Sequence, residues 1–166
     1  MMHMDTRNRT YNWEDPALLA SQANQLNGLE FLEKMIKAEL PFPPLLHTLD
    51  FKVSAIHPGR AEFTFQPQEF HFNPLGSVHG GVITAVLDSA MGCTLHSVLP
   101  LGTGYTTIDI KVNFLKSVNI KTGLMRATGA IINQGNRTAL LEARLIDENG
   151  KLYAFATSTC MILKSE

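Results

Sequence analysis

Residues 73–88 bring together two features that could do chemistry. His79, Gly80 and Gly81 precede an apolar stretch that is typical of a buried helix. The first backbone N–H groups of a helix have no partner within it and lie at the positive end of its dipole, where they can hold an anion or a developing oxyanion. Asp88 lies within the apolar stretch, where an ionised carboxylate needs a partner or a function. The segment thus pairs a candidate oxyanion site with a candidate functional carboxylate.

Each of these residues also has a structural interpretation. The glycine pair could simply permit close packing, and Asp88 could face solvent at the helix surface. His79 taken singly is more typical of a structural histidine, and Asn73 taken singly of a turn residue. The apolar neighbours of Asp88 argue against a freely solvated face, but local pattern alone leaves both interpretations open.

The sequence does not indicate metal chemistry. His71, His79 and Asn73 do not form a recognisable ligand set, and Cys93 and Cys160 match neither zinc-ligand nor CxxC spacing. We interpret both cysteines as buried thiols in a reducing compartment. We therefore expect a protein without a metal or other cofactor.

Composition favours a compact globular chain. It has 166 residues and 18.3 kDa, with 45% hydrophobic and 17% charged residues and a net charge of −1. The absence of a basic field argues against a nucleic-acid partner. The polar N-terminus lacks the apolar middle of a signal peptide, and no stretch approaches the roughly 18 apolar residues that span a bilayer. We expect a cytoplasmic protein with no membrane partner.

Residue periodicity predicts the elements that position the candidate groups. Residues 1–14 are expected to be poorly ordered, and the prolines at 41–44 should end the second helix. The predicted elements are helices over 15–24 and 29–36, a hairpin over 51–65, a loop over 67–77, a helix over 79–98, and strands over 106–114, 124–130, 139–145 and 152–163. One apolar helix among antiparallel strands favours an α+β fold with a single sheet packed on that helix. Its exposed edge predicts a partner subunit.

Three segments together resemble a known family. The run N-P-L-G-S-V-H-G-G, then L-D-S-A-M-G, then T-T-I-D-I-K-V-N-F-L is similar to the PaaI-type acyl-CoA thioesterases of the hotdog superfamily. The resemblance covers residues 45–163. It implies a hotdog fold, in which an antiparallel sheet wraps around one long central helix. The hotdog thioesterase domain would then span 46–166 and follow a partly helical N-terminal extension over 1–45.

The resemblance also implies roles for individual residues. Asp88 matches the family's nucleophile or general base, and Gly80 matches the residue whose N–H polarises the thioester carbonyl. Asn73 matches a side chain that positions the carbonyl or water, and His79 the adjoining motif histidine. Thr107 matches a hydroxyl that orients the attacking water, with Thr106 as a one-residue alternative.

Further residues are candidates for binding acyl-CoA. Basic side chains should lie near the phosphates of coenzyme A, which favours Lys116 and Arg137, although solvated surface charge is the simpler interpretation of each. The candidate substrate-binding residues are Gly81, Thr106, Lys116 and Arg137. The acyl group itself stays open, because pocket length depends on packing.

Helix geometry constrains how such a site is assembled. Gly80 and Asp88 are eight residues apart, which is roughly 12 Å along one helix, so one carbonyl cannot contact both. A site that uses both must join Gly80 of one subunit to Asp88 of another, in a homodimer or a homotetramer built from two dimers. The alternatives are an acyl-CoA-binding hotdog protein that does not hydrolyse its ligand, and a hotdog dehydratase or hydratase.

Overall fold

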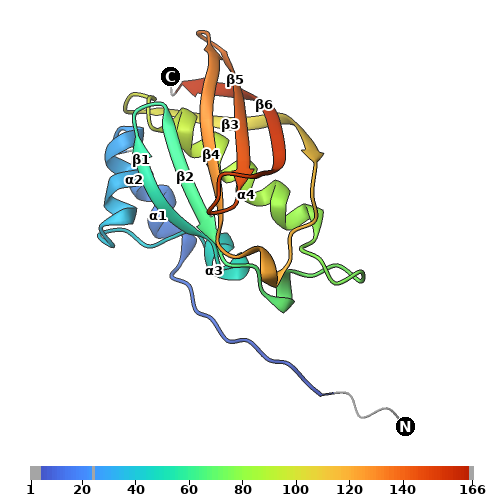
Figure 1. Cartoon of the computed structure of the whole chain (residues 1–166). Coiled ribbons are helices and arrows are strands. Elements are labelled where there is room, and N and C mark those ends of the chain that lie inside the picture. Colours follow the sequence, from blue (N-terminus) through green and yellow to red (C-terminus); the bar gives the residue numbers. More distant parts are fainter. Residues whose placement is uncertain (1–4, 24, 165–166) are drawn as a thin grey trace.

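The protein folds as a curved antiparallel sheet around one long helix. The computed structural model describes residues 5–23 and 25–164, and Figure 1 shows the sheet wrapping around helix α4. The helices are α1 (Pro16–Ala23), α2 (Gly28–Ile36), α3 (Pro44–Leu49) and α4 (Gly80–His96), and the strands are β1 (Lys52–His57), β2 (Arg60–Phe65), β3 (Thr103–Phe114), β4 (Met125–Gln134), β5 (Thr138–Ile146) and β6 (Leu152–Lys164). This arrangement confirms the predicted α+β hotdog fold.

The sheet leaves its long third strand at an edge. The strand order is β1-β2-β4-β5-β6-β3, and every adjacent pair is antiparallel. On one side β3 pairs with β6 from Thr103 to Phe114, and on the other side no described strand accompanies it. An edge of twelve residues presents a row of unpaired backbone groups that another chain can pair with.

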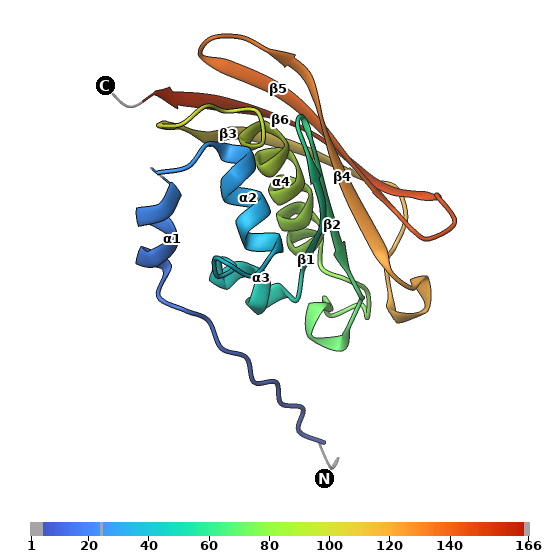
Figure 2. The same cartoon turned by 90° about the vertical axis from the view of Figure 1, so that its left-hand side faces the viewer.

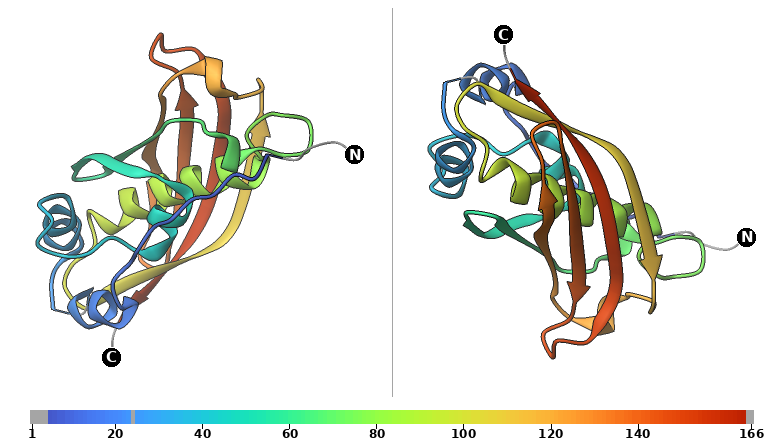
Figure 3. Two further views of the ribbon diagram at one scale, coloured as in Figure 1. Left: turned by 90° about the horizontal axis from the view of Figure 1, so that it is seen from below. Right: turned by 90° about the horizontal axis from the view of Figure 1, so that it is seen from above.

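Helix α4 crosses the concave side of the sheet, as Figure 3 shows from two directions. Its apolar face is fully buried, with Val86, Leu87 and Ala90 at 0% exposure. The helix packs closely on β4 because Gly129 has no side chain, and a Cβ at that position would lie 2.5 Å from the backbone oxygen of Ala90. This packing fixes the helix, and therefore its candidate chemical groups, relative to the strands.

Helix α2 packs beside α4 and the β1 edge, and α1 packs against α2 (Figure 2). Asn27 caps α2 by accepting from the Glu30 N–H, and the Glu30 side chain accepts from Asn27 in return. Gly28 lies directly against the His96 carbonyl at the end of α4, where a Cβ would overlap that group. The helical pattern predicted for 15–36 is confirmed, and it continues the core rather than standing apart from it.

The structure differs from the predicted elements at α3, at two short 3-10 helices and at the end of β4; one of the 3-10 helices, Ile120–Thr122, lies between β3 and β4. Helix α3 was not predicted, because the prolines that end the second helical pattern also begin a new helix, with Pro44 in its first turn. A short 3-10 helix, Glu69–His71, lies within the predicted loop, and β4 continues to Gln134, past the start of the predicted turn.

The segment before α1 is extended and is tied to the body of the protein. Residues 5–15 have no regular secondary structure, but the Arg9 guanidinium donates to the carbonyls of His47 and Thr48, at 2.6 Å each. We expected residues 1–14 to be poorly ordered, but the described part of this segment is attached to the rest of the protein through Arg9. Residues 1–4 lie outside the described residues. No helix in the described part of the chain is long and apolar enough to cross a membrane.

Candidate active site

Helix α4 carries the candidate donor at its first residue. The His79 side chain caps the helix, because its Nδ1 accepts from the Gly81 N–H at 2.9 Å. The Gly81 N–H is therefore occupied. Within the described residues of this chain the Gly80 N–H has no hydrogen-bond partner, so it is the donor that remains for an incoming group.

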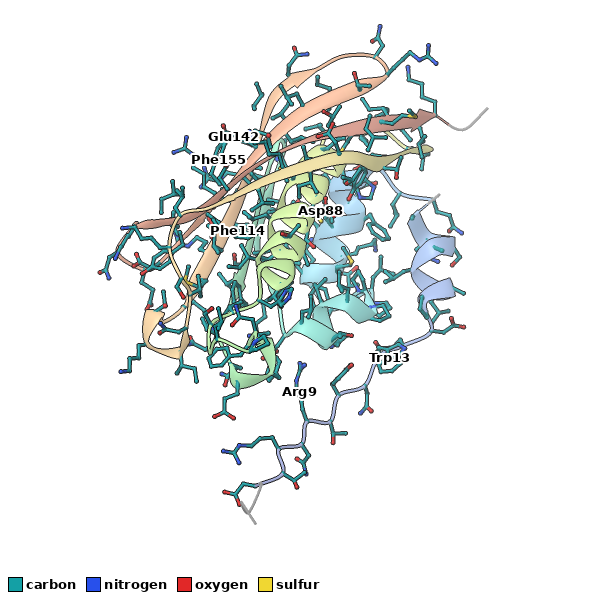
Figure 4. All side chains as sticks on the ribbon, turned by 90° about the vertical axis from the view of Figure 1, so that its right-hand side faces the viewer. Arg9, Trp13, Asp88, Phe114, Glu142 and Phe155 are labelled. Carbon is teal, nitrogen blue, oxygen red and sulfur yellow. The ribbon has the colours of Figure 1, made fainter. Side chains whose placement is uncertain are left out.

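Asp88 lies two turns further along α4 and faces β3. The Thr107 hydroxyl donates to Asp88 Oδ1 at 3.0 Å, which leaves Oδ2 without a partner among the described residues. Figure 4 shows Asp88 on the side of α4 that faces the edge strand. The carboxylate is half-buried, so it is oriented by one hydrogen bond and can still be reached by water or substrate.

The two candidate threonines lie on opposite faces of β3. Thr107 pairs with the buried Cys160 and points toward α4, whereas Thr106 pairs with Met161 and is exposed on the outer face. Successive strand residues point to opposite faces, so only one of the two can contact Asp88. The hydrogen bond places Thr107 there.

The loop before α4 is shaped by Asn73. Its Oδ1 accepts from the N–H groups of Leu75 and Ser77, at 2.9 and 3.3 Å, and its Nδ2 donates to the Ser77 hydroxyl at 3.0 Å. Most of the hydrogen-bonding capacity of this amide is thus used to hold the loop, and one N–H remains.

Asn73, Gly80 and Lys116 line one open cavity of about 360 Å³. Phe114, half-exposed at the end of β3, covers the start of α4, and a Cβ at Gly80 would lie 3.1 Å from its ring. Arg137 lies elsewhere, against Thr138 and the end of β6. The structure therefore forms two separate groups on one chain: Asp88 with Thr107, and Gly80 with Asn73 and Lys116.

Three weakly acidic side chains, Cys93, Tyr105 and Cys160, lie near Asp88. Burial raises the pKa of the Cys93 thiol to about 12, and the nearby Asp88 charge adds to this rise. Burial likewise raises the pKa of Tyr105 well above its ordinary value, and it raises the pKa of Cys160. These groups stay protonated at neutral pH, so they add no charge beside Asp88.

Sequence reasoning missed Tyr105 and Phe114 as residues of this region. A signal for Tyr105 was available, because a residue two positions before Thr107 on the same strand shares its face. Phe114 carried no such signal, since its position over Gly80 depends on the path of the chain after β3. Among residues 5–23 and 25–164, no group of three or more His, Cys, Asp or Glu side chains could hold a metal ion.

Comparison with known proteins gives consistent matches. The thioesterase superfamily model matches residues 75–154. A 1,4-dihydroxy-2-naphthoyl-CoA hydrolase of Listeria monocytogenes is 25% identical over 120 residues, which are 72% of this chain and 96% of the relative. Among solved structures, a phenylacetic acid degradation-related protein of Ralstonia eutropha is 28% identical with a TM-score of 0.70, over 78% of this chain and 97% of that one.

A thioesterase of Haemophilus influenzae shares the fold, with 23% identity and a TM-score of 0.68 over 72% of this chain and 82% of that one. The matched segment contains α4 with Asp88 and the whole of β3 with Thr107. Taken with the fold of Figure 1, these matches show a hotdog fold in which residues 75–154 are similar to the thioesterase superfamily.

Proposed function

We propose that the protein hydrolyses acyl-CoA thioesters to a free acid and coenzyme A, at a site that two copies of the chain form together. The observation that carries this proposal is that the candidate carboxylate and the candidate N–H donor lie at separate points of α4. Thr107 orients the Asp88 carboxylate at one point of the helix, and the unpartnered Gly80 N–H lies roughly 12 Å away along the axis.

The exposed edge strand supports assembly around this region. Strand β3 carries half-exposed Ile108 and Phe114 along an edge that no other described strand of the single chain pairs with. Antiparallel pairing of two β3 edges about a two-fold axis would satisfy their backbone groups and cover these side chains. The same axis would bring Gly80 of the partner subunit toward Asp88.

The chemistry follows from these positions. Asp88 takes a proton from water, and the water oxygen attacks the thioester carbonyl carbon. The Gly80 N–H of the partner subunit stabilises the oxyanion, a type of donor whose removal costs about 10²–10³-fold in kcat. When the carbon–sulfur bond breaks, Asp88 returns the proton to the thiolate of coenzyme A. In the alternative route Asp88 attacks directly, and water then hydrolyses the resulting acid anhydride.

Coenzyme A as the leaving group is supported by the cavity beside the donor. Lys116 lines the same cavity as Gly80 and Asn73, where an ammonium group could pair with a phosphate. Arg137 lies away from both groups of candidate residues, and we assign it no contact. The Listeria relative, named for a naphthoyl-CoA substrate, supports a CoA thioester as the substrate class.

Replacing Asp88 tests the proposal directly. Thiol release from a panel of aliphatic and aromatic acyl-CoAs should identify substrates of the native protein. Asp88→Asn should lower kcat/KM by about 10²–10⁴-fold, because it removes the general base. Its thermal unfolding and oligomeric state should match those of the native protein.

Other outcomes would redirect the assignment. Tight binding of an acyl-CoA without hydrolysis by the native protein would support a non-hydrolytic acyl-CoA-binding protein instead. Hydrolysis that survives in Asp88→Asn would show that another group is the base.

A further inference from the structure

The extended segment before α1 reaches into the protein through the side chain of Arg9. Residues 5–15 are exposed except for Arg9, which is half-buried, and Figure 4 shows its side chain pointing from the segment toward the body of the protein. A cavity of about 540 Å³ is lined by Arg9 and Tyr11 together with Phe42 and Phe51, so the segment does not pack closely on these apolar side chains. Specific contacts of Arg9, and not apolar packing, therefore attach the segment.

Arg9 shares the end of α3 with a buried histidine. The last carbonyls of a helix have no partner within it, and here two side chains from distant parts of the chain take three consecutive ones. The Arg9 guanidinium donates to the carbonyls of His47 and Thr48, at 2.6 Å each. His71 Nε2 donates to the next carbonyl, that of Leu49, at 2.8 Å.

The same guanidinium lies against the loop that leads to α4. Its Cζ is 4.0 Å from the centroid of the Phe70 ring, which is a cation–π contact. Phe70 directly precedes His71, whose carbonyl accepts from the His79 N–H at 2.8 Å. Arg9 thus connects the end of α3 to the base of the loop, where the chain enters α4.

We propose that Arg9 is a positioning residue that holds the start of α4, and with it the Gly80 N–H, by clamping the base of this loop against α3. His79 links the clamp to the donor, because it bonds to the loop base, caps α4 and directly precedes Gly80. The inference rests on the proposed function, in which the Gly80 N–H must match the position of the oxyanion. A displacement of about 1 Å at a reacting centre can lower the rate by about 10²-fold. The N-terminal extension thus acts on the reaction without touching the substrate.

Hydrogen exchange, followed by mass spectrometry, measures the clamp without any substrate. In Arg9→Ala, amide exchange over 68–81 should be about tenfold or more faster than in the native protein, because two hydrogen bonds from a charged donor are lost. Arg7→Ala is the matched control on the same segment. Both side chains of the ion pair between Arg7 and Glu69 are largely exposed, so this variant should exchange like the native protein. Arg9→Lys keeps the charge without the planar fork and should lie between Arg9→Ala and the native protein.

Steady-state kinetics of thiol release connect the clamp to the donor. Arg9→Ala should lower kcat by about tenfold, with a smaller change in KM, because the misplaced N–H stabilises the oxyanion less. In Gly80→Pro, which lacks the donor N–H, the same substitution should leave the remaining kcat unchanged. A purely structural role of Arg9 would instead lower kcat equally in both backgrounds.

Unchanged exchange over 68–81 in folded Arg9→Ala overturns the inference, and so does an equal loss of kcat in the native and Gly80→Pro backgrounds. If the native protein hydrolyses no acyl-CoA, the proposed function fails, whereas faster exchange in Arg9→Ala still supports the clamp. If Arg9→Ala does not fold, Arg9→Lys takes its place with the same outcomes.

Discussion

At the scale of single residues, the orientation of Asp88 depends on one hydroxyl group. Thr107 donates to one carboxylate oxygen at 3.0 Å and also lies 3.8 Å from the Cys160 sulfur. With Oδ1 held in this way, the free Oδ2 points to a defined place for water or substrate. Thr107 is thus a positioning residue for the proposed reaction.

Thr107→Val should lower kcat/KM by roughly 10–100-fold, because a hydrogen bond to a charged group contributes about 1.5–3 kcal/mol. The valine is similar in shape, so KM and thermal stability should change much less than kcat. The measurement is steady-state thiol release with the best native substrate.

Thr106→Val is the matched control, since it makes the same change on the outer face of the same strand. Equal losses in the two variants would show that the hydroxyl of Thr107 has no special role. A loss of activity confined to Thr106→Val would show that Thr106, and not Thr107, has the positioning role.

At the scale of elements, the loop that carries Asn73 is anchored by a buried histidine. His71 is 1% exposed, accepts from the Gln68 N–H at Nδ1, and has Nε2 2.8 Å from the Leu49 carbonyl, to which it donates. Its own carbonyl accepts from the His79 N–H. The neutral ring therefore ties the loop to α3, and the backbone carbonyl of the same residue ties it to the start of α4.

This anchor predicts a loss of stability in mild acid. Burial lowers the pKa of His71 from 6.5; the hydrogen bond to the Leu49 carbonyl and the nearby Asp50 charge oppose this shift, and Arg9 adds to it. Because the folded-state pKa is the lower one, the unfolded chain binds more protons as the pH falls below 6.5. Stability should be full above that pH and decline below it, by at most about 1.4 kcal/mol per pH unit for this group.

Urea unfolding at pH 7.5 and pH 5.5 measures the effect. His71→Gln keeps a donor and an acceptor without a titrating ring, so its free energy of unfolding should change less between the two conditions. His57→Gln, at an exposed position on β1, is the control and should behave like the native protein. Identical pH dependence in all three proteins would rule out His71 as the cause.

Element prediction succeeded where a periodic pattern was long. The buried face of α4 and the alternating strands could be read from the sequence, and both are present. Helix α3 could not, because six residues that begin at a proline offer too short a pattern. The contact of Gly28 with the His96 carbonyl joins residues far apart in the chain, and no local pattern encodes it.

The same limit applies to the candidate site: residues marked by a local pattern could be predicted, and those that depend on tertiary contacts could not. The H-G-G segment and Asp88 could be singled out locally, and the fold places them at the start and middle of α4 as expected. The choice between Thr106 and Thr107 required the register of β3 against β6, which a bulge after Thr107 alters. Tyr105 became visible only once the face of that strand was fixed.

At the scale of the whole molecule, each chain would supply two half-sites, and this arrangement can be tested by mixing variants. Gly80→Pro removes the candidate donor N–H at the first position of α4, where proline is well tolerated. His79 already has the extended backbone, φ −61° and ψ 138°, that a residue before proline adopts. Gly80→Ala keeps the N–H and controls for the added side chain near Phe114.

Gly80→Pro alone should lower kcat by about 10²–10³-fold, and Gly80→Ala by much less. Gly80→Pro and Asp88→Asn are then unfolded together and refolded as an equal mixture. A mixed dimer contains one intact site, made of Asp88 from the Gly80→Pro chain and Gly80 from the Asp88→Asn chain. Random pairing should restore about one quarter of native activity, since half of the dimers are mixed and each has one of two sites intact. A mixture no more active than its two components would show that the site does not combine these residues from different subunits.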